Sequence, residues 1–175
     1  MYEIRIHSRG GQGGVTAARL LALAAIHDGK YATACPFYGA ERRGAPIVSF
    51  VRIDDKPIKV YSQIKKPDMV VVLDASVMDV VDVMQGIKKG GRVFVNSASK
   101  KEFDGVSSYH VDLTGIALKE KLVVAGSPIL NTPVLGALAK MGIISADSAK
   151  KAIREMFSDE RNVKAAEAAY QEMIA

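Results

Sequence analysis

Apolar and polar residues follow three regular patterns along this chain, and each pattern predicts a different element. In residues 2–7, isoleucines alternate with charged residues, the period of two that is typical of a half-buried strand. Residues 15–26 are apolar nearly all round and long enough for a buried helix. Residues 69–73 form a continuous apolar run, which is typical of a central strand covered on both faces. The chain therefore begins as a series of βα units.

The other elements are predicted from the same patterns and from turn signals. Asp54-Asp55-Lys56-Pro57 marks a turn, and residues 58–61 are expected to pair back on the preceding strand as a hairpin. Gly29 is expected in the left-handed conformation that stops the first helix. Thr132 and Pro133 suit the cap and the first position of a helix. Further strands are predicted over residues 31–37, 47–53, 92–97 and 107–111, and further helices over 76–87, from near Thr114, over 145–157 and over 159–174.

A hairpin inside a series of βα units makes the sheet mixed rather than purely parallel. We therefore predict an α/β fold with three-layer, Rossmann-like βα units around a mostly parallel, mixed sheet. The sequence shows no repeat and no interdomain linker, so we expect a single domain over residues 1–175.

A glycine-rich stretch joins the first strand to the first helix and reads Arg9-Gly10-Gly11-Gln12-Gly13-Gly14. Glycine permits positive φ and lets another group approach the backbone closely. The free N–H groups and positive dipole end of the following helix favour an anion, and Arg9 adds a charge. A tight turn without a ligand is the alternative, but it requires fewer glycines. We predict a contact with an anion or a partner at this loop.

Two common nucleotide-binding motifs do not match this loop. A Walker motif ends in Gly-Lys-Ser/Thr, and no lysine follows these glycines. The dinucleotide fingerprint requires a third glycine where Thr16 stands, and an acidic residue after the second strand. That strand ends in Cys35-Pro36-Phe37 instead. Nicotinamide or flavin binding is therefore disfavoured.

Composition narrows the class of protein. The chain has 175 residues, of which 49% are hydrophobic and 25% charged, as in an ordinary globular domain. No apolar run reaches the ~20 residues that cross a bilayer, and the N-terminus enters a strand directly, so we expect no signal peptide and no membrane contact. One cysteine makes no internal disulfide, which fits the cytoplasm. The net charge of +5 is scattered, which disfavours nucleic-acid binding.

Several polar residues are candidates for a binding site. Arg42 and Arg43 lie in a loop with two glycines, where a binding role and a solvated charged loop both remain open. Asp74 and Asn96 follow strands, where α/β proteins gather ligands, but a helix-capping or turn-forming role is favoured. The three histidines show no metal spacing. No complete catalytic set is present, so we expect neither catalytic nor metal-binding residues.

Three stretches together resemble the gamma subunits of the 2-oxoacid:ferredoxin oxidoreductase family. The first is the glycine-rich stretch, and the others are Tyr38-Gly39-Ala40-Glu41-Arg42-Arg43-Gly44-Ala45-Pro46 and Asn131-Thr132-Pro133-Val134-Leu135-Gly136-Ala137. Their order and spacing also match, over nearly the whole chain. The form of the second stretch is similar to the pyruvate branch, pyruvate:ferredoxin oxidoreductase, more than to the 2-oxoglutarate or indolepyruvate branches.

The resemblance implies a reaction and a division of labour. Such enzymes convert pyruvate, coenzyme A and oxidised ferredoxin to acetyl-coenzyme A, carbon dioxide and reduced ferredoxin. Thiamine diphosphate, Mg and the iron–sulfur clusters belong to the alpha, beta and delta subunits. A gamma chain with a single cysteine and no catalytic set fits that arrangement.

The resemblance also associates the gamma subunit with coenzyme A. It implies that Arg9 and the amides of Gly11, Gly13 and Gly14, or else Arg42 and Arg43, hold the pyrophosphate or the 3′-phosphate. Two alternatives stay open at this point. Instead of a subunit that contacts coenzyme A, the chain could be a free-standing module that binds an anion or a nucleotide, or a purely structural subunit whose loops touch only protein.

Overall fold

A mixed six-stranded sheet forms the centre of the molecule. The computed structural model describes residues 1–37 and 44–174. The order of the strands is β2-β3-β1-β4-β5-β6; the pairs β1–β4, β4–β5 and β5–β6 are parallel, and β3 is antiparallel to both β1 and β2. The α/β fold and the mixed sheet are thus confirmed. The strands are β1 (Tyr2–Arg9), β2 (Tyr31–Phe37), β3 (Pro46–Asp54), β4 (Met69–Val72), β5 (Arg92–Asn96) and β6 (Ser107–Val111).

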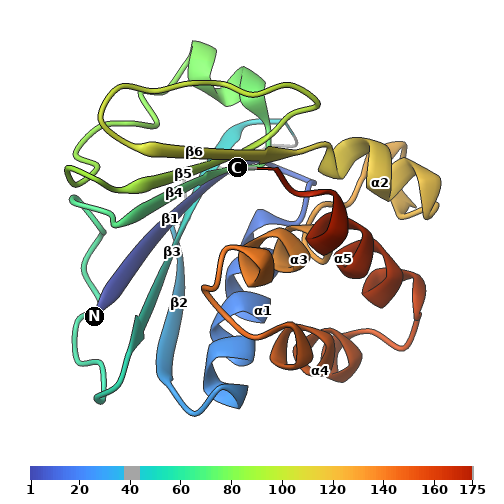
Figure 1. Cartoon of the computed structure of the whole chain (residues 1–175), viewed down its shortest axis with the longest axis horizontal. Helices are drawn as coiled ribbons and strands as arrows, with labels where there is room; N and C mark the ends of the chain where they lie inside the picture. Colours follow the sequence, from blue (N-terminus) through green and yellow to red (C-terminus); the bar gives the residue numbers. More distant parts are fainter. Residues whose placement is uncertain (38–43, 175) are drawn as a thin grey trace.

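The α-helices of the described residues gather on one side of this sheet (Figure 1). They are α1 (Gly14–His27), α2 (Leu113–Lys119), α3 (Pro133–Lys140), α4 (Ala146–Met156) and α5 (Arg161–Glu172). The alternation of β1 places Ile4 and Ile6 on this side, where both are fully buried beside Leu20 and Leu21 of α1. The first helix ends as predicted, with Gly29 at a φ of 77°. A small hairpin of β7 (Val123–Val124) and β8 (Ser127–Pro128) follows α2.

The other face of the sheet carries a thinner layer (Figure 1, green). The predicted helix over residues 76–87 is wrong: the chain forms only a five-residue 3₁₀ helix, η1 (Ala75–Asp79), followed by turns. This stretch is rich in valine, which loses side-chain freedom in a helix. The Asp82 carboxylate also accepts a hydrogen bond from the Met84 N–H, which favours a turn. The third layer therefore consists of short turns, and Val77 and Val83 pack there against the valines of β4 and β5.

Two buried arginines hold the loops that cover this face. Arg5 of β1 donates to the carbonyl oxygens of Val83 and Gln85, both at 2.7 Å. Arg52 of β3 donates to the Glu3 carboxylate at 2.9 Å and to the Ser62 carbonyl at 2.7 Å. The predicted hairpin at residues 58–61 is wrong, because this stretch forms no strand. This loop is held by hydrogen bonds from the Arg52 guanidinium and not by hydrogen bonds between strands.

The buried His7 makes stability depend on pH. Its Nε2 accepts a hydrogen bond from Arg5 Nε at 3.0 Å. Burial, with a smaller effect of the Arg5 charge, lowers the pKa of His7 from 6.5 to about 4. As the pH falls, His7 therefore takes up a proton near pH 6.5 in the unfolded chain but only near pH 4 in the folded chain.

We expect the free energy of unfolding to be highest above pH 6.5 and to fall between pH 6.5 and pH 4, by about 3 kcal/mol at most from His7. In the variant His7→Gln, whose amide oxygen keeps the acceptor for Arg5, this part of the decline should vanish. Urea unfolding of both proteins from pH 4 to pH 7 measures the difference. Parallel pH curves for the two proteins would contradict this assignment.

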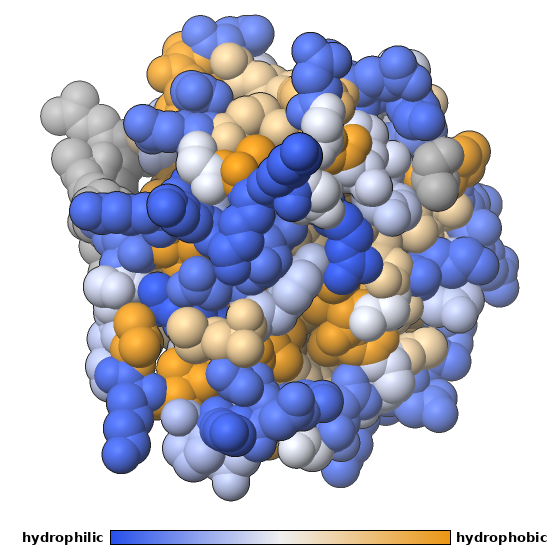
Figure 2. All heavy atoms as spheres, turned by 60° about the vertical axis from the view of Figure 1, so that its left-hand side comes forward, coloured by the Kyte–Doolittle hydropathy of each residue, from blue (hydrophilic) through white to orange (hydrophobic). Residues whose placement is uncertain are grey.

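The surface is mixed in character. On the side shown in Figure 2, hydrophilic side chains cover much of the molecule and apolar residues emerge in separate patches. Within the described residues, no helix has the length and apolar character needed to cross a membrane.

Candidate functional site

The glycine-rich loop between β1 and α1 has the backbone that its sequence predicts. Gly11 and Gly13 have φ values of 96° and 85°. A Cβ at Gly14 would lie 2.1 Å from the Ser8 hydroxyl oxygen, so this position has no room for a side chain. Gly13 is the N-cap of α1, and among residues 1–37 and 44–174 no side chain caps the helix there. The N–H groups of the first helical turn are therefore available at the loop.

The structure brings the ends of all three family stretches together. The Gly10 N–H donates to the Ala45 carbonyl at 2.9 Å, and the Gly44 N–H donates to the Gly10 carbonyl at 3.1 Å. On the other side of the loop, the N–H of Leu130, the residue just before the third stretch, donates to the Gln12 carbonyl at 3.1 Å. Stretches far apart in the sequence thus converge on a single loop. Arg42 and Arg43 lie outside the described residues.

An open cleft of about 440 Å³ lies at this convergence. Its polar end is formed by the glycine-rich loop, and apolar side chains from α1, β3 and the β7–β8 region form its walls. The cleft therefore combines anion-binding groups with apolar surface. The lining residues are Ser8, Arg9, Gly11, Gly13, Gly14, Val15, Thr16, Ile47, Val124, Ile129, Asn131 and Phe157.

Asn131 is the most informative side chain of the cleft. The residue is only 5% exposed, and its Oδ1 has no hydrogen-bond partner within the described parts of the chain. Its Cβ would lie 3.0 Å from a Cβ at Gly13, so the amide stands directly against the loop. A buried amide oxygen without a partner costs about 1–3 kcal/mol, which makes Asn131 a candidate ligand-binding residue of the cleft.

Arg9 ties two loops together through its guanidinium. Nε donates to the Ser76 hydroxyl at 2.7 Å, Nη2 to the Ser76 carbonyl at 3.1 Å, and Nη1 to the Gly44 carbonyl at 2.8 Å. Each of its nitrogens thus contacts protein. Its charge nevertheless stands at the edge of the cleft, which Arg9 lines.

Asp74 has the capping role that the sequence favoured, whereas Asn96 bridges two strands and a helix. Asp74 accepts a hydrogen bond from the Ser76 N–H at the start of η1. Burial alone would raise the pKa of Asp74, but hydrogen bonds from Ser76 and Gln12, with the charge of Arg9, outweigh it and lower that pKa. Asn96 donates to the Leu73 carbonyl at 2.8 Å and to the Thr114 hydroxyl at 2.9 Å, and so links β4 and β5 to α2.

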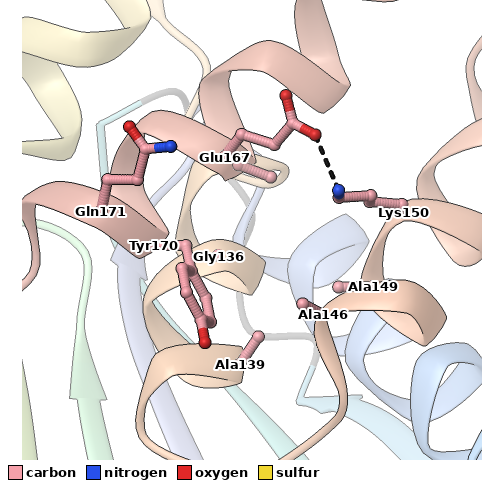
Figure 3. A pocket seen from close by; sticks show the side chains of 9 residues that line it. Gly136, Ala139, Ala146, Ala149, Lys150, Glu167, Tyr170 and Gln171 are labelled. Atoms are coloured by element: carbon pink, nitrogen blue, oxygen red, sulfur yellow. Dashed lines mark ion pairs between the residues drawn. The ribbon is translucent and has the colours of Figure 1, made fainter.

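A second hollow, of about 220 Å³, lies between α3, α4 and α5 (Figure 3). Small residues form much of its wall, among them Gly136, Ala139 and Ala149. Its two charged side chains, Lys150 and Glu167, pair with each other at 2.8 Å. Among the described residues that line this hollow, no buried polar side-chain atom lacks a hydrogen-bond partner. We therefore interpret the hollow as part of the helix packing. Within the described residues, no three histidine, cysteine or acidic side chains form a group that could hold a metal ion.

Fold and site together define a Rossmann-like α/β domain with a ligand-sized cleft at its glycine-rich loop. A family model described as "Pyruvate ferredoxin/flavodoxin oxidoreductase" matches residues 3–172. The chain therefore belongs to the pyruvate ferredoxin/flavodoxin oxidoreductase family. It is a gamma-type subunit of a multi-subunit 2-oxoacid:ferredoxin oxidoreductase, as the resemblance predicted, and other subunits complete the enzyme.

Proteins with similar sequences or structures align with this chain over nearly their whole length. The chain is 51% identical to pyruvate synthase subunit PorC of Methanocaldococcus jannaschii, over 99% of this chain and 98% of that one. It is 50% identical to the pyruvate/ketoisovalerate oxidoreductases common subunit gamma of Thermococcus kodakarensis, over 99% and 98% of the two chains. The crystal structure of pyruvate oxidoreductase subunit PORC from Thermotoga maritima matches with a TM-score of 0.82 and 35% identity, over 99% of this chain and 97% of that one.

Proposed function

We propose that this chain is a subunit of a pyruvate synthase and that its cleft binds part of coenzyme A. The enzyme converts pyruvate, coenzyme A and oxidised ferredoxin to acetyl-coenzyme A, carbon dioxide and reduced ferredoxin. The observation that carries the proposed coenzyme contact is the buried Asn131 oxygen, which has no partner among the described residues and lies in an open cleft at the start of α1.

The names of relatives favour coenzyme A over the 2-oxoacid as the ligand. The Thermococcus kodakarensis relative is named as the subunit common to the pyruvate and the ketoisovalerate oxidoreductases. A subunit shared by two such enzymes need not recognise the 2-oxoacid that distinguishes them. It suits a component that both reactions have in common, and among these components coenzyme A is the small molecule that carries phosphate groups.

The chemistry of coenzyme A fits both ends of the cleft. Its phosphates are anions, which the N–H groups of Gly11, Gly13 and Gly14 and the positive end of α1 favour. Its pantetheine arm is apolar with amide N–H groups, which suits the apolar walls and the Asn131 carbonyl oxygen. We include Arg9 as a charge at the edge of the site, and Arg42 and Arg43 as further phosphate ligands.

Other subunits supply the groups that this chain lacks. In our proposal, the alpha, beta and delta subunits carry thiamine diphosphate, magnesium and the iron–sulfur clusters, and the complex reduces ferredoxin in the cytoplasm. Those groups perform decarboxylation and electron transfer when bound, while this chain binds and orients the acyl acceptor. A purely scaffolding role is the second candidate, and the observation in its favour is that Arg9 contacts Ser76 and Gly44 with all three nitrogens.

Asn131→Leu separates the two candidates. Because leucine removes a buried oxygen without a partner, we expect the variant to be more stable, by about 1 kcal/mol. If coenzyme A contacts Asn131, its KM should rise about tenfold while the KM for pyruvate stays unchanged. The measurements are thermal unfolding of the chain and steady-state kinetics of the assembled enzyme, with each substrate varied separately.

Asn162→Leu is the matched control. Asn162 is also buried, but its side chain donates to the Asp159 carbonyl at 3.0 Å and accepts from the Thr132 hydroxyl at 3.1 Å. This variant should lose stability without any change in either KM. Unchanged coenzyme kinetics in Asn131→Leu would favour the scaffolding role.

A further inference from the structure

Asp74 stands at the end of β4, in contact with the side chain of Gln12 in the glycine-rich loop. We propose that Asp74 is a positioning residue: through Gln12, it holds the glycine-rich loop in the conformation that binds coenzyme A. This inference rests on the proposed coenzyme site and adds to it a residue outside all three family stretches.

The carboxylate of Asp74 links two segments. Its Oδ2 accepts a hydrogen bond from Gln12 Nε2 at 2.6 Å. Its Oδ1 accepts from the Ser76 N–H at 3.0 Å and from the Ser76 hydroxyl at 2.6 Å. One oxygen thus faces the loop and the other holds the start of η1. Since β4 is a buried central strand, the carboxylate stands on a rigid support.

Gln12 is the point at which the loop is held. It lies between Gly11 and Gly13, which both have positive φ and are the most permissive parts of the loop. Its Oε1 accepts from the Arg9 N–H at 2.9 Å, and its backbone carbonyl accepts from the Leu130 N–H at 3.1 Å. A single residue therefore joins the loop to β4 on one side and to the Asn131 segment on the other.

Donors surround the negative charge of Asp74, so it does not oppose an anion in the neighbouring cleft. The carboxylate receives the three hydrogen bonds just described, and Arg9 Nε lies 3.9 Å from its Oδ2. Asp74 is absent from the residues that line the cleft, whereas Arg9, Gly11 and Gly13 line it. We therefore assign Asp74 an effect through the loop rather than a contact with the ligand.

Asp74→Asn tests this effect with almost no change in shape. The remaining amide oxygen can still accept from the Ser76 N–H, so the cap of η1 survives. The new amide NH₂ faces the NH₂ of Gln12, donor against donor, so the link to the loop is lost. In the assembled enzyme we expect the KM for coenzyme A to rise about tenfold and the KM for pyruvate to stay within about twofold.

Hydrogen–deuterium exchange of the assembled enzyme provides a readout that does not depend on the coenzyme. The peptide over residues 9–16 should exchange faster in Asp74→Asn, because the loop loses its link to β4. Asp112→Asn is the matched control, since Asp112 also follows a strand and caps a helix, accepting from the Gly115 N–H at 2.8 Å, without contact to the loop. It should leave this peptide and both KM values unchanged.

A double variant tests whether the hydrogen bond itself matters. In Gln12→Glu/Asp74→Asn, the carboxylate introduced in the loop can accept both from the Arg9 N–H and from the amide introduced at position 74. The charge of the pair is conserved and the direction of the bond is reversed. We expect exchange of the 9–16 peptide to return close to the wild-type rate, whereas Asp74→Asn alone stays fast.

The outcomes separate this inference from the proposed function. Unchanged exchange of the loop in Asp74→Asn, or no recovery in the double variant, would overturn the positioning role. Faster exchange with an unchanged coenzyme KM would also overturn it as a role in coenzyme binding. If the coenzyme KM is then unchanged in Asn131→Leu as well, the proposed coenzyme site fails too; a raised KM there leaves that site standing.

Discussion

Gly136→Ala is expected to unfold the chain or to reduce its stability severely. Gly136 lies within α3, where the backbones of α3 and α5 touch. A Cβ added there would lie 1.7 Å from the Ala166 carbonyl oxygen and 2.6 Å from its carbonyl carbon. These are backbone atoms of a packed helix, so the overlap is relieved only by separating the two helices. We expect a loss of about 3 kcal/mol or more, at the upper end of overpacking effects.

Gly142→Ala is the control for this variant. Gly142 follows α3 with a φ of 73°, and a Cβ there would meet nothing within 4 Å. Its replacement should cost about 1 kcal/mol from backbone strain alone. Denaturant unfolding of both variants compares a steric clash with conformational strain. Equal losses in the two would show that the helices can move apart and that the contact is not decisive.

Gly13→Val is expected to weaken the binding of coenzyme A strongly. Valine is strained at a φ of 85°, and its Cβ would lie 3.0 Å from the Cβ of Asn131. The variant therefore either displaces the Asn131 amide or moves the start of α1. In the assembled enzyme, we expect the KM for coenzyme A to rise by at least about tenfold. Steady-state kinetics with coenzyme A and pyruvate varied separately measures the effect, and the yield of complex reports on assembly.

Gly29→Val separates strain from damage to the site. Gly29 has a similar φ of 77° at the other end of α1, with open space around it. Both substitutions should reduce stability by about 1–3 kcal/mol. Only Gly13→Val should change the coenzyme KM or the assembly. If coenzyme kinetics and complex yield match those of Gly29→Val, the loop is merely a permissive turn.

Local sequence patterns predicted most elements of this fold because their causes are local. The alternation in β1 and the apolar character of α1 follow from which faces are buried. The glycine-rich loop was also predictable, since positive φ at Gly11 and Gly13 is a property of the backbone. The predicted helix over residues 76–87 failed because helical spacing alone did not account for valine-rich composition and local aspartate turns.

The role of individual polar residues was less predictable, because hydrogen-bond partners lie far away in the sequence. Arg9 looked like a phosphate ligand, yet its guanidinium donates to Ser76 and Gly44. Arg5 and Arg52 are charged residues in strand sequences, yet they are buried and hold the loops of the outer face. A charge pattern along a strand does not reveal which carbonyl groups a distant loop will present.

The sequence by itself determined the α/β class, the mixed sheet, the glycine-rich turn and, through three spaced stretches, the family. Each of these depends on the backbone conformations that a residue favours, on the spacing of buried positions along an element, or on the order of motifs in the chain. Only the tertiary structure decided that Asn131 lies buried beside Gly13, with no partner for its oxygen in the described part of the chain, and that Asp74 reaches Gln12. Those contacts depend on the packing of β1, β4 and the segment before α3 against one another, which no local pattern specifies.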